Sequence, residues 1–218
     1  MIHSQKKLNA HLILLLCVVI LLPACKIATI RRLDSNGNKS NEAQTFNSRS
    51  FVDSIWESNL KPALSQALEL STLLKELDKD AEGAKVRYGH RTGSGPYYFI
   101  IKGSGRVVSV DTSSRMGTAM IAVASYDQRP VMLQIGPILK GTAIRDALPF
   151  IKTDQFANQI HFAEVANELN SRVEKTILDP VDRTQLKGRR IVFSGTAGAD
   201  DNQPLLITPV ELAMGEGR

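Results

Sequence analysis

Cysteine is almost absent from this sequence. Its 218 residues include two cysteines, Cys17 and Cys25, and none follows Cys25. A disulfide framework, a zinc site with thiolate ligands and a cysteine nucleophile are therefore excluded from the chain after Cys25. A chain of this length buries enough apolar surface to fold without such cross-links, so the shortage is compatible with an exported domain.

The sequence also has a small net charge and few aromatic side chains. Aromatic residues make up 6% of the chain, and the formal net charge is +5. Residues 1–24 contain Lys6 and Lys7 and no acidic residue, so the remainder carries 27 − 2 = 25 basic and 22 acidic side chains, a net charge of +3. Binding of single-stranded nucleic acid requires a basic groove with several exposed aromatic side chains. We therefore expect no nucleic-acid partner.

The longest apolar run is too short to cross a membrane. It extends from Leu12 to Ala24, whereas a spanning helix needs about 20 residues. A basic start, an apolar centre and a small-residue exit are typical of a signal peptide, which we assign to residues 1–24. An ordinary secretory signal that ends by chance in a cysteine is the alternative interpretation.

The end of this run, Leu22-Pro23-Ala24-Cys25, resembles the lipobox of bacterial lipoproteins. The resemblance implies cleavage before Cys25 and a thioether-linked diacylglycerol on its sulfur, often with a third acyl chain such as palmitate on the new amine. The expected location is the periplasmic side of a bacterial membrane, with the lipid as anchor. Lys26 stands where an aspartate tends to retain lipoproteins on the inner membrane, which favours the outer membrane.

The remaining chain divides by composition. Residues 25–49 are rich in Asn, Ser and Lys, lack an apolar period and predict a flexible tether that spans about 25–30 Å. Residues 50–213 have the periodic patterns of a single globular domain, and residues 214–218 form a short tail.

Two helices, or one kinked helix, are predicted over residues 50–80. Ser50 and Asp53 have the spacing of a capping box, and Pro62 is expected to end or kink the first helix near Leu60. The second helix, about 63–78, has one apolar face that predicts core packing, formed by Leu70, Leu73, Leu74 and Leu77.

Residues 88–213 predict a small barrel. Strands are expected over 97–102 and 106–111, joined by a turn or as one bent strand, and then over 117–124 and 131–135. A helix follows over about 160–177, and two strands, 189–194 and 205–212, end the domain. This order is that of an OB-like five-stranded Greek-key barrel with a helix between its third and fourth strands. The fold class is therefore α+β, with an N-terminal helical hairpin.

Polar residues gather in two places. The segment Tyr88–Tyr97 holds His90 and Arg91 beside a Gly-Ser-Gly loop, which would suit an anion or a sugar hydroxyl, or would simply lead into the first strand. Arg145, Asp154 and Asn158 are embedded among apolar residues. They could line a carbohydrate site beside Phe150 or Phe156, or instead pair internally and cap the following helix.

No catalytic or metal-binding pattern is found. After cleavage only His90 and His161 remain, and neither has the spacing of a zinc motif. Ser94, Ser104 and Ser194 lack the G-x-S-x-G context of a nucleophile elbow. We expect no metal, no cofactor and no catalytic residue.

Several stretches together resemble a family of predicted bacterial periplasmic lipoproteins of unknown function. The resemblance covers nearly all of residues 50–213. It implies an OB-like barrel and frequent encoding beside ABC-type sugar uptake systems, and it implies no activity. The stretches are Phe51–Trp56, Tyr88–Tyr97, Gln134–Pro137, Gly141–Phe150, Phe156–Gln159, Val165–Asn170 and Leu205–Pro209.

The leading hypothesis is a non-enzymatic accessory lipoprotein that binds a small polar ligand or a protein partner. Its expected partners are the membrane, through the lipid on Cys25, and a sugar ABC transporter or the solute-binding protein of that transporter. The alternative is an enzyme that acts on periplasmic glycans. That activity requires two carboxylates in one cleft, and the sequence nominates no such pair.

Overall fold

The computed structural model of the protein describes residues 46–198 and 204–215. The predicted signal peptide, Cys25 and most of the predicted tether lie outside these residues. By their contacts, these described residues belong to one compact unit.

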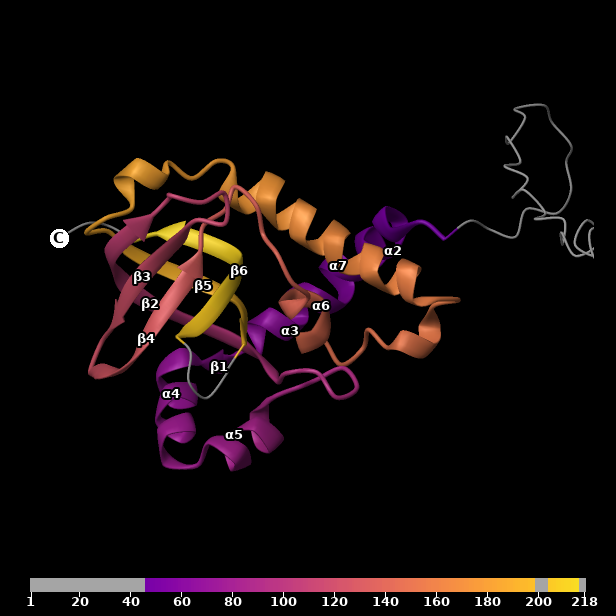
Figure 1. Ribbon diagram of the computed structural model, residues 1–218, viewed down its shortest axis with the longest axis horizontal. Coiled ribbons are helices and arrows are strands. Elements are labelled where there is room, and N and C mark those ends of the chain that lie inside the picture. The colour runs from indigo at the N-terminus through magenta and orange to yellow at the C-terminus, as the bar shows by residue number, and fades with distance from the viewer. Residues whose placement is uncertain (1–45, 199–203, 216–218) are drawn as a thin grey trace, which may run out of the picture. The chain divides into compact units, whose positions relative to one another are not determined.

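Five strands form a closed barrel (Figure 1). The strands follow one another in the order β2-β3-β4-β6-β5, and β5 pairs with β2 to close the ring. All pairs are antiparallel except β4 with β6. The helical segment lies between β4 and β5, so the fold is α+β with an OB-like barrel, as the sequence predicts. The strands are β2 (Tyr98–Asp111), β3 (Thr118–Val123), β4 (Tyr126–Gln134), β5 (Arg190–Gly198) and β6 (Leu205–Met214).

Strand β2 is one continuous bent strand, and no turn interrupts it at residues 103–105. A Cβ atom on Gly103 would lie 2.9 Å from the Cβ of Leu70, and one on Gly105 would lie 2.9 Å from the carbonyl oxygen of Ala122. The two glycines therefore allow helix and strand backbones to pack closely against β2.

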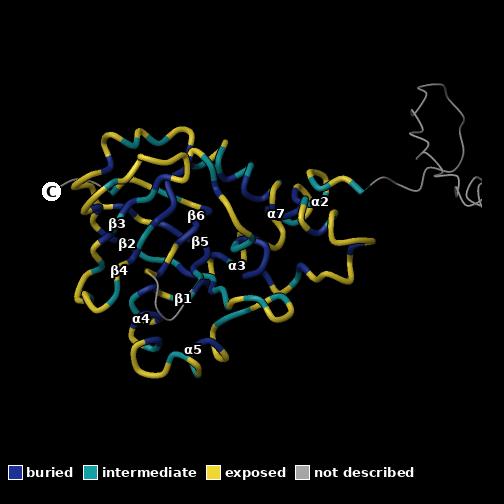
Figure 2. The backbone as a smooth tube through the Cα atoms, viewed as in Figure 1, coloured by how far each residue is buried: buried dark blue, intermediate teal, exposed yellow. Residues whose placement is uncertain are grey.

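The barrel core is closed at one end by α4 (Leu70–Lys79). The predicted leucine face of this helix is buried against strand residues such as Phe99 and Ile101. A two-residue strand, β1 (Leu68–Glu69), precedes α4 and pairs with β2 in parallel, an element that the sequence did not predict. Figure 2 shows the buried interior of the barrel beside the exposed outer faces of its strands.

A second apolar core lies between helices outside the barrel. It contains Trp56, Leu148, Phe162 and Leu169, and its members come from several helical segments. These segments are α2 (Ser48–Ile55), the π-helical turn η1 (Trp56–Leu60), α3 (Lys61–Ser65), α6 (Ala143–Ala147), η2 (Thr153–Gln155), α7 (Gln159–Val173) and the π-helical turn η3 (Glu174–Leu178). A short 3₁₀ turn, η4 (Arg183–Gln185), leads to β5.

The first helices differ from the prediction in three details. Asn47, not Ser50, caps α2, because its side chain accepts a hydrogen bond from the Ser50 amide. Pro62 does not end the helix: the turn before it widens to a π-helix, and the Lys61 amide bonds to the carbonyl of Trp56. The break comes later, at β1, and an unpredicted helix, α5 (Ala81–Tyr88), follows α4.

Candidate functional site

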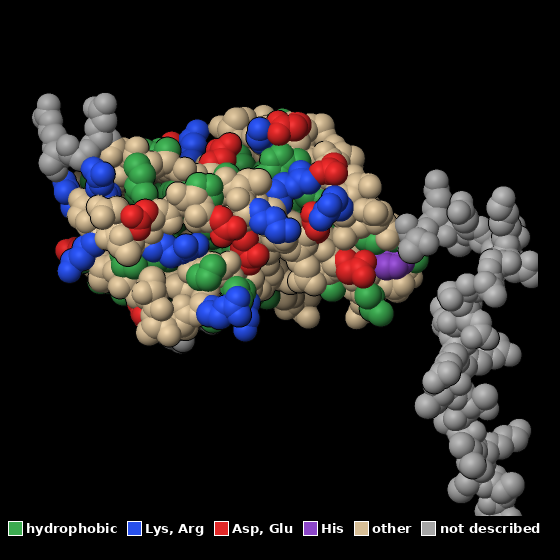
Figure 3. All heavy atoms as spheres, turned by 90° about the horizontal axis from the view of Figure 1, so that it is seen from above, with side chains coloured by type: hydrophobic (Ala, Val, Ile, Leu, Met, Phe, Trp, Pro, Cys, Tyr) green, Lys and Arg blue, Asp and Glu red, His purple; other side chains and the backbone are tan. Residues whose placement is uncertain are grey.

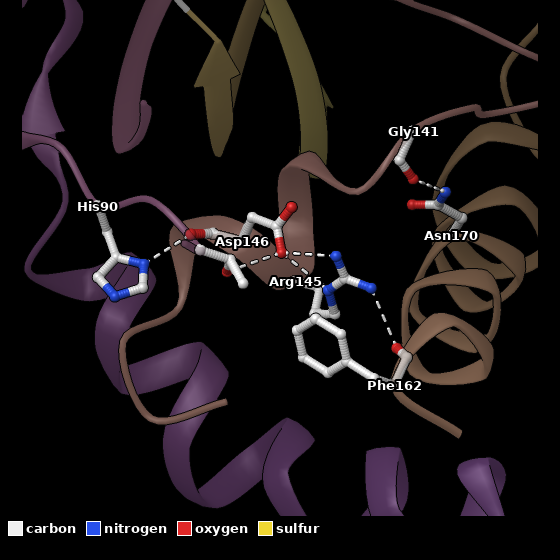
Figure 4. A network of polar contacts seen from close by, with 7 residues as sticks. His90, Gly141, Arg145, Asp146, Phe162 and Asn170 are labelled. Atoms are coloured by element: carbon white, nitrogen blue, oxygen red, sulfur yellow. Dashed lines mark hydrogen bonds and ion pairs between the residues drawn. The ribbon is translucent and has the colours of Figure 1, made fainter. Parts of the chain in front are cut away.

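Two of the predicted site residues meet at Asp146, on α6 (Figure 4). The Nδ1 of His90 donates to the carbonyl oxygen of Asp146 over 2.6 Å. The carboxylate of Asp146 accepts from the Thr92 hydroxyl at 3.0 Å and from Nε of Arg145 at 2.8 Å. Asp146 therefore joins α6 to the segment before β2 in two ways: its backbone carbonyl accepts from His90, and its carboxylate accepts from Thr92.

Arg145 is fully engaged inside the protein. Its side chain and that of Asp146 are only 9% and 10% exposed, and Nη2 lies 2.8 Å from Oδ1 of Asp146. Nη1 donates to the carbonyl oxygen of Phe162 at 3.1 Å, and the guanidinium lies 3.6 Å from the centre of the Phe162 ring. A buried charge pair is tolerated when hydrogen bonds satisfy both groups, so Arg145 joins α6 to α7 and does not face a ligand.

The other three predicted residues lie apart from this network. Arg91 is exposed, with its guanidinium 4.6 Å from the centre of the Tyr97 ring. Asp154 is exposed on η2. Asn158 caps α7, because its side-chain oxygen accepts from the His161 amide at 2.9 Å. The structure therefore brings together His90 and Arg145 and leaves Arg91, Asp154 and Asn158 separate.

A groove of about 600 Å³ opens on the side of the network where His90 lies. Three segments that are distant in the sequence form it: residues 59–68 from η1 to β1, residues 87–100 from the end of α5 to the start of β2, and residues 147–150 at the end of α6. Its apolar wall contains three aromatic rings, those of Tyr88, Tyr98 and Phe150. Tyr88 is 39% exposed, so a flat apolar surface is available to a ligand.

Polar groups of different kinds lie along the same groove. Asn59 and Gln66 provide side-chain amides, Arg87 a guanidinium and His90 an imidazole. Because Nδ1 of His90 donates to a carbonyl, Nε2 of the neutral ring is the hydrogen-bond acceptor. Arg87 is held by Glu76, 3.2 Å away, but its side chain remains half exposed. The groove therefore offers both donors and acceptors.

Along the groove, the described residues include one imidazole, that of His90, but no carboxylate to act with it. None of the described residues that line it is acidic. Within residues 46–198 and 204–215, no group of three His, Cys, Asp or Glu side chains is placed to hold a metal ion. The arrangement is suited to binding, through ring stacking and hydrogen bonds.

Three side chains with shifted pKa values lie outside the groove. Burial and a hydrogen bond to Asp78 raise the pKa of Tyr126 to about 12. Hydrogen bonds from Ser113 and Thr184 hold the pKa values of Asp111 and Asp182 below the usual range. None of these three groups lines the groove, so they do not supply it with a titrating group.

The profile of a family described as "Predicted periplasmic lipoprotein (DUF2291)" matches residues 15–213. The chain belongs to this family. The match includes Cys25 and all of the barrel except Met214, and the family's description gives no activity. No curated protein matches the chain.

A solved structure has the same fold. The crystal structure of an OB-fold protein from Thermotoga maritima superposes with a TM-score of 0.65 at 20% identity, over 79% of this chain and 100% of the other. At this identity the likeness shows the fold alone. No helix among the described residues is both long enough and apolar enough to span a membrane.

Proposed function

We propose that this family member is a lipid-anchored accessory protein that binds a small polar ring, with a sugar as the foremost candidate, in the groove beside His90. One observation carries the proposal. The groove combines three aromatic rings with two amides, a guanidinium and an imidazole, drawn from three separate segments.

Sugar chemistry fits this combination. A pyranose ring has an apolar face of C–H groups and an edge of hydroxyl groups that both donate and accept hydrogen bonds. Tyr88 and Phe150 offer surfaces for the apolar face, while Asn59 and Gln66 can each donate and accept at once. Arg87 adds donor capacity at Nη1, since its Nε donates to the carbonyl oxygen of Gly83 and its Nη2 pairs with Glu76.

The membrane anchor is the second part of the proposal. We assign a thioether-linked diacylglycerol to Cys25, supported by the lipobox-like sequence and by a family match that includes this residue. Intact-mass analysis of the membrane-extracted protein should show loss of residues 1–24 and the added mass of acyl chains. A Cys25→Ser variant should keep the leader, and an unmodified wild-type mass would contradict the assignment.

The alternative is an enzyme that acts on periplasmic glycans. Hydrolysis of a glycosidic bond uses two carboxyl groups about 5–10 Å apart across the substrate. The described groove residues supply none, so we favour a binding protein. The resemblance to a family often encoded beside ABC-type sugar uptake systems supports a sugar ABC transporter or its solute-binding protein as the partner.

Isothermal titration with a panel of monosaccharides, disaccharides and nucleosides tests the groove. At least one compound should bind, and Tyr88→Ala should weaken it about tenfold by removing the exposed ring. Gln66→Ala should weaken it about fivefold, the effect of one hydrogen bond near 1 kcal/mol.

The matched control is Gln185→Ala, which removes an exposed glutamine that does not line the groove. Its affinity should equal that of the wild type. If no compound binds, or if Gln66→Ala and Gln185→Ala behave alike, the groove is not the site.

A further inference from the structure

Two arginines lie side by side on neighbouring strands, on the outer surface of the barrel. Arg106 on β2 and Arg190 at the start of β5 are directly opposite partners in the antiparallel pairing of these strands. Both side chains are exposed. Like charges in opposite positions destabilise a sheet, so this pair does not serve the stability of the barrel.

Neutral acceptors alone hold the two guanidinium groups. Nη1 of Arg106 donates to the carbonyl oxygen of Gly188 at 3.0 Å, and Nη2 of Arg190 donates to the Ser104 hydroxyl at 3.2 Å. In the described part of the chain, neither arginine forms an ion pair with a carboxylate. Two more cations, Lys187 and Arg189, are exposed in the turn that leads to Arg190.

The surface around these charges is hollowed and partly apolar. A depression of about 330 Å³ lies between Ser104, Arg106 and Arg190 on one side and residues 122–124 on the other. On the outer face of the same strands, Val108 is 45% exposed and Val192 is 48% exposed. We name this surface, formed by Arg106, Val108, Lys187, Arg189, Arg190 and Val192, the basic face.

The basic face lies far from the point where the chain enters from Cys25. The amide of Gly215 bonds to the carbonyl oxygen of Arg190, so the face is at the end of the molecule that carries the C-terminus. Figure 1 shows α2, the first helix after the predicted tether, at the opposite end. Figure 3 shows Lys and Arg side chains at the C-terminal end and also in the middle of the visible face, with Asp and Glu side chains among them.

We infer that the basic face docks a protein partner that presents carboxylates beside an aliphatic side chain. Carboxylates would neutralise the opposed arginines in bidentate pairs, and the aliphatic group would cover Val108 or Val192. The face lies at the other end of the domain from α2, the first described helix. It also lies apart from the His90 groove, so a partner and a small ligand can bind together.

The test uses the full-length lipoprotein in nanodiscs of zwitterionic phospholipid. The probe is a fluorescein-labelled peptide with two aspartates on each side of one leucine, and binding is followed by fluorescence anisotropy. The wild type should bind, and raising the salt concentration should weaken the complex, because exposed charges are screened. Arg106→Gln/Arg190→Gln should weaken binding about tenfold or more.

Lys140→Gln/Lys175→Gln is the matched control, since it removes from other surfaces two exposed cations that have no ion-pair partner among the described residues. The control should bind like the wild type. The arginine variant should unfold at the same temperature as the wild type or slightly higher, because it removes a repulsive pair.

Three results would overturn the inference. In the first, the wild type fails to bind the peptide. In the second, both double variants lose affinity equally, which would indicate attraction by net charge alone. In the third, the peptide binds in zwitterionic discs and is displaced when anionic phospholipid is included at the same salt concentration. The occupant would then be the headgroups of the protein's own membrane.

Discussion

The barrel core and the helical core are built in different ways. The barrel core consists mainly of apolar strand residues and the leucine face of α4, and the polar side chains buried on its strands, Gln134, Ser194, Thr196 and Thr208, are uncharged. The helical core is also apolar but is bordered by the buried Arg145–Asp146 pair, whose hydrogen bonds join α6, α7 and the segment before β2. The groove opens where this polar junction meets the barrel. The comparison supports the proposal that the junction carries the small-ligand site and that the barrel positions it.

Phe99→Ala gives the largest expected effect. Phe99 is fully buried in the barrel core, and loss of its ring should lower the free energy of unfolding by about 3–5 kcal/mol. The single tryptophan, Trp56, lies in the helical core and reports that region by fluorescence, while circular dichroism reports the whole domain. Coincident midpoints in denaturant would show one cooperative unit, and separate midpoints would show two.

Asp146→Ala should cost about 3 kcal/mol, because it leaves the charge of Arg145 buried without its partner. The double variant Arg145→Met/Asp146→Leu should recover most of this loss, since it removes both charges and keeps similar volume. Urea denaturation of the two variants and the wild type measures both values. Equal stability of Asp146→Ala and the wild type would show that the pair does not hold the junction together.

Tyr126→Phe should lower stability at neutral pH by about 1 kcal/mol, through loss of the hydrogen bond to Asp78 on α4. The pKa of Tyr126 is about 12 in the folded protein, above the ordinary value of 10.0. The contribution of this proton to stability is therefore complete below pH 10 and is lost as the pH rises through 12. Denaturation at pH 8 and at pH 11 should show a steeper decline for the wild type than for Tyr126→Phe.

Thr196→Val should have the smallest effect on stability, and unlike the other variants it should stabilise the protein. Thr196 is buried on β5, and among the described residues its hydroxyl has no hydrogen-bond partner. Replacing an unsatisfied hydroxyl by a methyl group of similar shape should raise the free energy of unfolding by up to about 1 kcal/mol. A decrease of that size in thermal unfolding experiments would show that the hydroxyl has a partner, such as a water molecule.

The sequence predicts the barrel well because alternation along a strand directly reports which face is buried. It does not predict β1, whose two residues are too few to show a period, or α5, whose polar and small residues show little amphipathic pattern. The capping error at Ser50 has a similar origin. Asn47 and Ser50 are both good capping residues, and the backbone decides between them.

The candidate site was only partly predictable. His90 and Arg145 are recognised as polar residues among apolar ones, but their roles depend on tertiary contacts with Asp146 and Phe162. The groove brings Gln66 beside residues more than twenty positions later in the chain, and no spacing rule reports that proximity. The signal that the sequence offered for the groove was an aromatic residue, Tyr88, at the start of a polar segment.

Chemical-shift mapping of the isotopically labelled lipoprotein in the presence of sugars tests the division between scaffold and junction most directly. We predict that at least one sugar moves the amide signals of Tyr88, His90 and residues 147–150 the most, and leaves those of β3 and β4 in place. Largest shifts in β3 or β4, or no shift with any sugar, would contradict the assignment of binding to the junction.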